Sequence, residues 1–211
     1  MKTLINHLLL NNLDEIVSKS IFNCHCKGLH SIMLLDAPEK TIRLYIAKKG
    51  NDMYRNNYID DMLPRDDMSI GFHSHNCNLT LECIKGEFHN WLVKEVDFNT
   101  KGFNIDKWEY RSHIITGNMG FEHIDISRLE TISYNHIKKG ESVFLNAKDI
   151  HTVACNPLET SAWLVYEGKK DIDYKSYNWS INNLSKVNSD GLYVKPSYNE
   201  IIELLIETDL I

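Results

Sequence analysis

Three histidines stand in contexts that could hold a metal ion. His73 and His75 are one residue apart at the start of the alternating run GFHSHNCNLTLECIKG (residues 71–86), and His151 begins a second alternating run, HTVAC. Alternate residues of a strand share a face, so His73 and His75 would point to the side that the apolar residues of their run occupy. A buried imidazole is costly unless it is hydrogen-bonded or binds a metal, which it does through a ring nitrogen. The three histidines therefore predict a metal site.

The elements that must position these residues are mostly short strands. SIMLLD and TIRLYIA flank a turn at residues 37–39 and predict a hairpin between Ser31 and Ala47. Further strand-like runs are EFHNWLVKEV, KWEYRSHIIT, RLETISYNHI, ESVFLN, IHTVAC and SAWLVYE, with Gly-, Asn- and Pro-containing turns between them. Many short strands with regular turns favour a sandwich or barrel.

Both ends of the chain have helical patterns. Leu4, Leu8, Leu9, Leu13, Ile16 and Val17 recur at helical spacing, and Ser197 with Glu200 predicts a capping box before a C-terminal helix. We therefore expect an all-β-dominated fold in one domain, residues 1–211. Its parts would be a helical segment at 1–28, a barrel at 29–170, and a wrapping segment with the C-terminal helix at 171–211.

The two histidine runs resemble the two sequence motifs of the cupin superfamily, whose members are jelly-roll β-barrels that hold one metal. His73-x-His75 and Gly86 match the first motif, and Gly140 and His151 match the second at the expected separation. Two positions depart from the pattern. Leu79 stands where the family has its Glu ligand, and Asn146-Ala147-Lys148 replaces the Pro-x-Gly turn. The resemblance spans roughly residues 60–170 and implies a cupin-type jelly-roll β-barrel.

A cupin site without the Glu resembles the three-histidine centre of the cysteine and thiol dioxygenases. This resemblance implies Fe(II) held by His73, His75 and His151, with Zn(II), Mn(II) or Ni(II) as alternatives. It also implies a non-haem iron oxygenase acting on a small polar or thiol substrate. Candidates for further roles are Glu82 as an additional ligand, if a β-bulge turned it inward, and Arg55, Arg111, Tyr166, Cys77 and Cys155 as catalytic or substrate-binding residues. Cys77 and Cys155 are alternatively small core residues.

Two other functions remain open. Three histidines also suit Zn(II), which would support a hydrolase or isomerase acting on a small molecule, a nucleotide-like one included. The missing Glu and the altered turn instead favour a cupin that binds a small molecule without chemistry, its histidines bonded to backbone or water.

Charge and composition indicate which kinds of partner the protein is expected to bind. The net charge of −6 and the even spread of basic residues argue against nucleic-acid binding. No apolar stretch approaches the roughly 20 residues that span a bilayer. Five cysteines without framework spacing indicate reduced thiols in a cytoplasmic protein. Cupins often form homodimers, so a homodimer is a further expectation.

The remaining histidines are expected to be structural. In the stretch NCHC (residues 23–26), adjacent residues do not easily close a tetrahedral site, and we expect free thiols at a helix end. His89, His113, His123 and His136 lie on strand-like runs and are expected on the surface or in the barrel wall.

Overall fold

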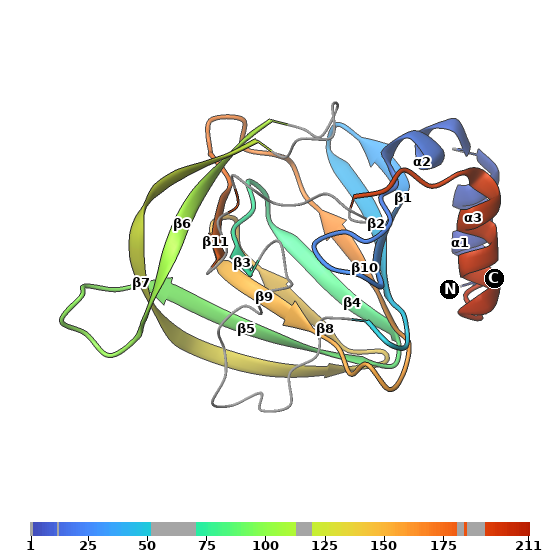
Figure 1. Cartoon of the computed structure of the whole chain (residues 1–211). Helices are drawn as coiled ribbons and strands as arrows, with labels where there is room; N and C mark the ends of the chain where they lie inside the picture. Colours follow the sequence, from blue (N-terminus) through green and yellow to red (C-terminus); the bar gives the residue numbers. More distant parts are fainter. Residues whose placement is uncertain (1, 12, 52–70, 113–119, 181–183, 185–192) are drawn as a thin grey trace.

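The computed structural model describes residues 2–11, 13–51, 71–112, 120–180, 184 and 193–211. Their helices and strands, in chain order, are α1 (Lys2–Asn11), α2 (Leu13–Lys19), β1 (Leu29–Ala37), β2 (Lys40–Ala47), β3 (Phe72–His73), β4 (Leu79–Lys85), β5 (Glu87–Glu95), β6 (Phe103–Ser112), β7 (Gly120–Lys138), β8 (Ser142–Leu145), β9 (Ile150–Ala154), β10 (Ser161–Glu167), β11 (Tyr177–Ser180) and α3 (Tyr198–Glu207) (Figure 1).

The strands of the described residues form two sheets. The first has five strands in the order β1-β2-β10-β4-β8, and the three helices lie together against its outer side (Figure 1). The second is closed, in the order β11-β3-β9-β5-β7-β6, because β6 pairs with both β7 and β11. The predicted fold class is confirmed: a β-dominated, cupin-type double sheet with helices at both ends.

Three apolar clusters fill the layers. One packs the helices against the five-stranded sheet, with Leu44 and Leu164 among its buried residues. The second lies between the two sheets and includes Leu81 and Trp163. The third lies inside the closed sheet, where Phe72 and Trp179 are fully buried. The space between the two sheets is therefore an interior layer, whereas one face of β7 is exposed, with Ile126 and Ile132 about half exposed.

Local sequence signals predict several elements correctly. β1 and β2 form the expected hairpin, with Ala37 paired to Lys40 across a two-residue turn. Ser197 and Glu200 make the predicted capping box at the start of α3. The N-terminal pattern forms two helices rather than one, since α1 ends at Asn11 and α2 begins at Leu13. Asn disfavours a helix interior because its side chain competes for backbone hydrogen bonds.

The alternating run that contains His73 and His75 is not one strand. β3 ends at His73 in the closed sheet, and β4 begins at Leu79 in the five-stranded sheet. Asn78 secures the connection: its carbonyl accepts from the Gly168 backbone N–H at 2.9 Å, and its side chain accepts from the Ala147 N–H at 2.7 Å. The run thus crosses from one sheet to the other beside the interior layer, which both of its halves face.

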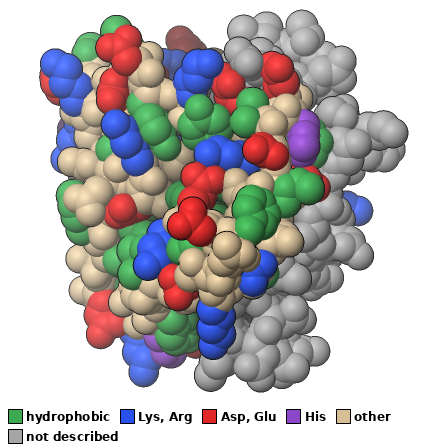
Figure 2. Space-filling model, turned by 90° about the vertical axis from the view of Figure 1, so that its left-hand side faces the viewer, with side chains coloured by type: hydrophobic (Ala, Val, Ile, Leu, Met, Phe, Trp, Pro, Cys, Tyr) green, Lys and Arg blue, Asp and Glu red, His purple; other side chains and the backbone are tan. Residues whose placement is uncertain are grey.

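The surface is mixed in charge. On the face shown in Figure 2, basic and acidic side chains are interspersed. Within the described residues, every helix is too short or too polar to cross a membrane.

Candidate metal centre

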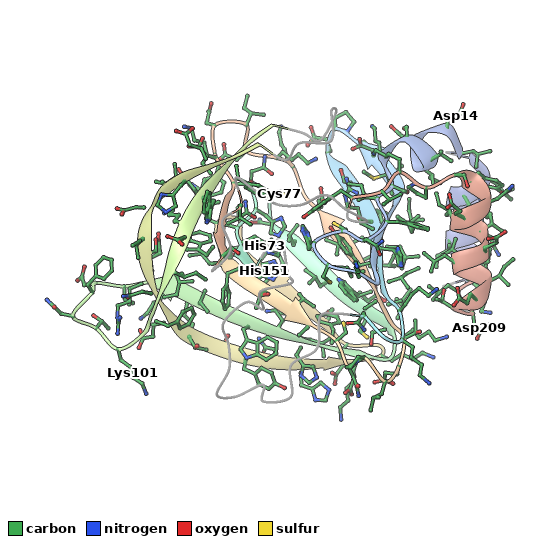
Figure 3. The ribbon with its side chains drawn as sticks, in the orientation of Figure 1. Asp14, His73, Cys77, Lys101, His151 and Asp209 are labelled. Atoms are coloured by element: carbon green, nitrogen blue, oxygen red, sulfur yellow. The ribbon has the colours of Figure 1, made fainter. Side chains whose placement is uncertain are left out.

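His73, His75 and His151 converge, and Figure 3 shows His73 and His151 between the two sheets. One ring nitrogen of each lies within 4.8 Å of the other two, and His75 Nε2 is 3.1 Å from His151 Nε2. Two nitrogens that each bind one ion at about 2.1 Å are about 3.0–3.4 Å apart at octahedral or tetrahedral angles. The His75–His151 distance therefore suits two ligands of one ion.

Strand pairing brings the motifs together. His73 on β3 is the direct antiparallel partner of His151 on β9. His75 lies in the segment after β3, and its carbonyl accepts a hydrogen bond from the Lys148 backbone N–H at 3.0 Å. The turn that precedes β9 is closed by Asp149, whose carboxylate accepts from the Asn146 backbone N–H at 2.7 Å. A backbone hydrogen bond thus holds His75 against the turn at residues 146–149, which directly precedes His151 on β9.

Lys148 occupies the glycine slot of the family's second motif and adopts a glycine-like conformation. Its φ is 77°, in the left-handed region that costs a residue with a Cβ about 1–2 kcal/mol. The turn geometry that the resemblance implies is therefore kept, although the residue that best suits it is absent.

Asn90 on β5 orients His151. The His151 Nδ1–H donates to Asn90 Oδ1 at 2.8 Å, and the Asn90 side chain is fully buried. Because the proton lies on Nδ1, the Nε2 lone pair points to the other two histidines. A hydrogen-bonded partner on the second ring nitrogen is the usual support of a metal-binding histidine. Sequence reasoning missed Asn90, since only the β5–β9 register, which pairs Leu92 with His151 and Asn90 with Val153, brings Asn90 diagonally beside His151 on the same face.

Burial keeps the three imidazoles neutral. It lowers the pKa of His73 to about 3, with a smaller contribution from neighbouring His75. Burial and then the nearby His25 lower the pKa of His75 to about 4. The pKa of His151 is also well below the ordinary value, through burial first and the neighbouring histidines second. Neutral imidazoles offer the lone pairs that a metal needs.

These residues fit a metal ion. His73 Nδ1 is buried and makes no hydrogen bond to the described residues. An unpaired buried nitrogen costs about 1–3 kcal/mol. The three neutral imidazoles need not release a proton before they bind a cation. A set of three imidazole nitrogens suits Fe, Zn, Ni and Cu.

The histidines line a pocket with a largely apolar wall. Its other described lining residues are His25, Leu29, Tyr45, Gly71, Leu79, Leu81, Thr152, Val153, Trp163, Val165 and Glu167. Tyr45 and Trp163 stack with ring centroids 5.6 Å apart and planes 9° apart, which gives the wall a flat aromatic section.

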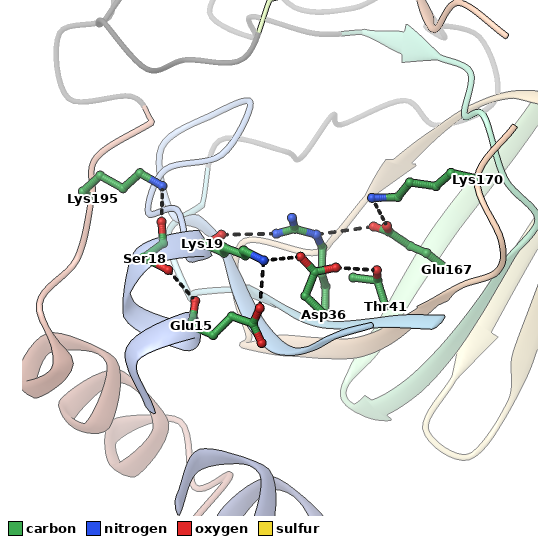
Figure 4. Close-up of polar contacts among 9 residues, drawn as sticks. Glu15, Ser18, Lys19, Asp36, Thr41, Glu167, Lys170 and Lys195 are labelled. Atoms are coloured by element: carbon green, nitrogen blue, oxygen red, sulfur yellow. Dashed lines mark hydrogen bonds and ion pairs between the residues drawn. The ribbon is translucent and has the colours of Figure 1, made fainter. Parts of the chain in front are cut away.

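Glu167 contributes a carboxylate to the pocket, and two cations pair with it. Arg43 Nε lies 3.3 Å from Glu167 Oε1, and Lys170 Nζ lies 3.6 Å from Oε2 (Figure 4). Arg43 also reaches the Lys19 carbonyl at the end of α2. The carboxylate is therefore held by the five-stranded sheet and its helical cover, and its charge is balanced.

A fourth histidine, His25, stands next to the cluster. Its ring centroid is 5.8 Å from that of His73, and its Nδ1 is 3.1 Å from the Tyr193 hydroxyl. Left-handed φ values at Asn23 (52°) and His25 (72°) turn this segment toward the pocket. The NCHC stretch was the sequence signal. Its two cysteines are buried and form no disulfide, as expected, but they lie in a turn beyond the end of α2 at Lys19.

Glu82 and Tyr166 do not face the three histidines. On β4, Leu81 and Cys83 belong to the cluster between the sheets, so alternation turns Glu82 to the helix-covered side. Tyr166 on β10 faces the same side and donates its hydroxyl to Glu82 Oε2 at 2.9 Å. The structure corrects both expectations: no bulge re-aims Glu82, and the two residues bond to each other.

The two cysteine candidates are not brought to the site either. Cys77 and Cys155 are buried in the core between the sheets, and neither lines the pocket. Burial raises the pKa of Cys77 to about 11 and that of Cys155 well above its usual value, so both thiols stay protonated. Arg111 lies on β6, with its side chain outside the described residues, and Arg55 lies outside them altogether.

The fold and the site define a cupin-type protein with a candidate three-histidine metal centre. No protein-family model matches the chain, and no curated protein matches it. Solved structures with similarity include the hydroxypropylphosphonic acid epoxidase from S. wedmorenis (13% identity, TM-score 0.38, covering 72% of this chain and 56% of that one). An RmlC-like cupin from Shewanella frigidimarina has 12% identity and a TM-score of 0.36, covering 74% and 89%. Hydroquinone 1,2-dioxygenase from Sphingomonas sp. TTNP3 has 10% identity and a TM-score of 0.36, covering 78% and 73%.

The chain spans about half the length of the first of these proteins. Cupins are the family that the two histidine motifs resemble. Likenesses this distant say nothing about activity, which has to be argued from the site itself.

Proposed function

We propose that this protein is a metal-dependent enzyme, specifically a non-haem iron oxygenase acting on a small molecule. The proposal rests on the convergence of His73, His75 and His151, all neutral, at the wall of one pocket. When bound there, Fe(II) would supply open coordination positions for a substrate and O₂.

The protein's own residues would hold and shield the centre. The Asn90 hydrogen bond keeps His151 in the tautomer that binds through Nε2. Leu79, Leu81 and Val165 line the pocket, so a substrate seated there would displace water from an apolar wall. In a water-poor site, fixed dipoles and charges act more strongly than they do in water.

The wall favours a substrate with an apolar, flat body and little net charge. The described lining residues include no lysine or arginine that could bind a substrate carboxylate. The carboxylate of Glu167 is already paired with Arg43. Within the expected class of small polar or thiol molecules, this favours an uncharged one that packs against Tyr45 and Trp163.

A zinc-dependent hydrolase or isomerase is the second candidate. The observation that favours it is His25, whose imidazole lies beside His73 and contacts the Tyr193 hydroxyl. Zinc in such a site lowers the pKa of bound water to about 7. Burial lowers the pKa of His25 to about 3, so its neutral imidazole, held by Tyr193, would act there as a hydrogen-bonding partner of that water.

Metal analysis of matched variants tests both candidates. Wild type, His73→Ala, His151→Ala and the control His123→Ala would be expressed untagged in iron-supplemented medium, purified anaerobically and analysed for metals. His123 is an exposed histidine on β7, paired with Asp106 at 3.0 Å, and does not line the pocket. Oxygen consumption with small uncharged thiols and phenols would follow on the iron-loaded protein.

The outcomes separate the candidates. One equivalent of iron, lost in His73→Ala and His151→Ala but kept in His123→Ala, supports the oxygenase. Zinc with the same variant pattern supports the hydrolase or isomerase. Absence of metal at this site after reconstitution would refute both and leave a cupin that binds a small molecule without chemistry.

A further inference from the structure

A second group of metal-binding side chains lies on the closed sheet, away from the pocket. Glu87 and His89 are on β5 and His136 is on β7, and one ligand atom of each lies within 4.8 Å of the other two. We propose that this group binds a divalent zinc ion and so links β5 to β7.

The sheet itself fixes the geometry of the group. His89 and His136 are direct partners across the antiparallel pair, with ring centroids 4.4 Å apart and planes 14° apart. Glu87 lies two residues before His89, so both side chains point to the same face. Glu87 Oε2 is 2.8 Å from His136 Nε2. Two strands at fixed register thus present three ligands without any loop.

Tyr134 supports His89 in the way that a ligand histidine is usually supported. Its hydroxyl lies 2.5 Å from His89 Nδ1, and the two rings are stacked. This contact sets the ring orientation and makes Nε2 the nitrogen through which His89 would bind an ion. A second hydrogen-bonded ring nitrogen both orients and strengthens a histidine ligand.

Two of the three side chains of this group are partly exposed, so an ion bound there could exchange with solvent. His89 is buried, whereas the side chains of Glu87 and His136 are 29% and 34% exposed. An ion held here would lose part of its water shell and keep water on its open side. The Glu87 carboxylate would offset one unit of its charge. Two imidazoles and one carboxylate suit zinc, whereas calcium and magnesium prefer sites made of oxygen alone.

Stacking of the two imidazoles and the Glu87–His136 contact would stabilise the β5–β7 strand pair without any ion, which is the competing explanation. The two explanations differ in what they predict for bound metal. They can be tested independently of the three-histidine centre, because β5 presents His89 on one face and Asn90, the partner of His151, on the other.

The test counts zinc equivalents by competition with a chromophoric chelator after the protein has been stripped of metal. The variants are wild type, His136→Gln, Glu87→Gln and His151→Ala, with circular dichroism to verify folding. His123→Gln is the matched control, because His123 is also an exposed β7 histidine paired with a carboxylate, that of Asp106, but belongs to no three-ligand group among the described residues.

We expect His136→Gln to bind one zinc equivalent fewer than wild type and Glu87→Gln to bind that equivalent at least tenfold more weakly. His151→Ala should keep it, and His123→Gln should match wild type. If His136→Gln binds as many equivalents as wild type with unchanged affinity, the proposal is overturned. It is also overturned if His151→Ala alone abolishes all zinc binding. Neither result depends on which metal the three-histidine centre holds.

Discussion

Replacing Asn90 by leucine should weaken metal binding at the three-histidine centre without touching a ligand. Asn90 is fully buried and accepts the His151 Nδ1–H at 2.8 Å. Leucine has a similarly branched but larger side chain and no hydrogen-bond acceptor. His151 would then be free to place its proton on Nε2, the nitrogen that faces His75 at 3.1 Å, and so lose the lone pair that binds the ion.

The magnitude follows from the hydrogen bond that is lost. Removing the partner of a metal-binding histidine typically costs 10–100-fold in affinity, about 1.4–2.7 kcal/mol. The metal-free protein should also lose about 1–3 kcal/mol of unfolding free energy, because His151 Nδ1 loses its hydrogen-bond partner in the interior whichever ring nitrogen carries the proton.

The assay is a competition titration with a chromophoric chelator, using Zn(II) in air and Fe(II) under anaerobic conditions. It would be run in a His136→Gln background, so that the second proposed site does not contribute. The control is Asn135→Leu, an exposed asparagine directly opposite Asn90 on β7. A folded Asn90→Leu protein whose affinity stays within twofold of the background would refute the role given to Asn90.

Three further predictions concern stability. Lys148→Gly should raise the free energy of unfolding by about 1 kcal/mol, because it relieves a left-handed φ of 77°. Lys169→Gly, the control at a position without positive φ, should lower the free energy of unfolding. Urea denaturation of both variants measures the two changes, and equal changes would contradict the prediction. His30 is 7% exposed, and burial lowers its pKa to about 4. Below pH 6.5, His30 therefore binds a proton in the unfolded chain but stays neutral in the folded protein. The free energy of unfolding falls by up to about 3 kcal/mol between pH 6.5 and 4. In His30→Leu, the free energy of unfolding should fall less between pH 7 and pH 5 than in wild type, by the contribution of one proton, as measured by denaturation at both pH values. An unchanged pH dependence would contradict the role given to His30. Tyr166→Phe should cost about 1 kcal/mol through the lost bond to Glu82 and leave metal content unchanged; loss of metal would show that the pair supports the centre after all.

Local sequence patterns determined much of this protein. Alternation and turn residues predict the β1–β2 hairpin, and Ser197 with Glu200 predicts the start of α3. The spacing of His73, His75 and His151 predicts the three residues that meet. These features depend on the period of a strand, on turn geometry and on hydrogen bonds between residues close in sequence.

Pairing between distant segments determined the rest. The run through His75 divides between two sheets because its halves find different partners: His73 pairs with His151, and Leu79 pairs with Leu145. His25 reaches the pocket through a backbone turn that the sequence does not reveal. Asn90 and the Glu87, His89 and His136 group depend on the β5–β9 and β5–β7 registers. The sequence determines which residues of a strand share a face. Which faces meet depends on the register between strands distant in sequence, because that register depends on the packing of the whole core.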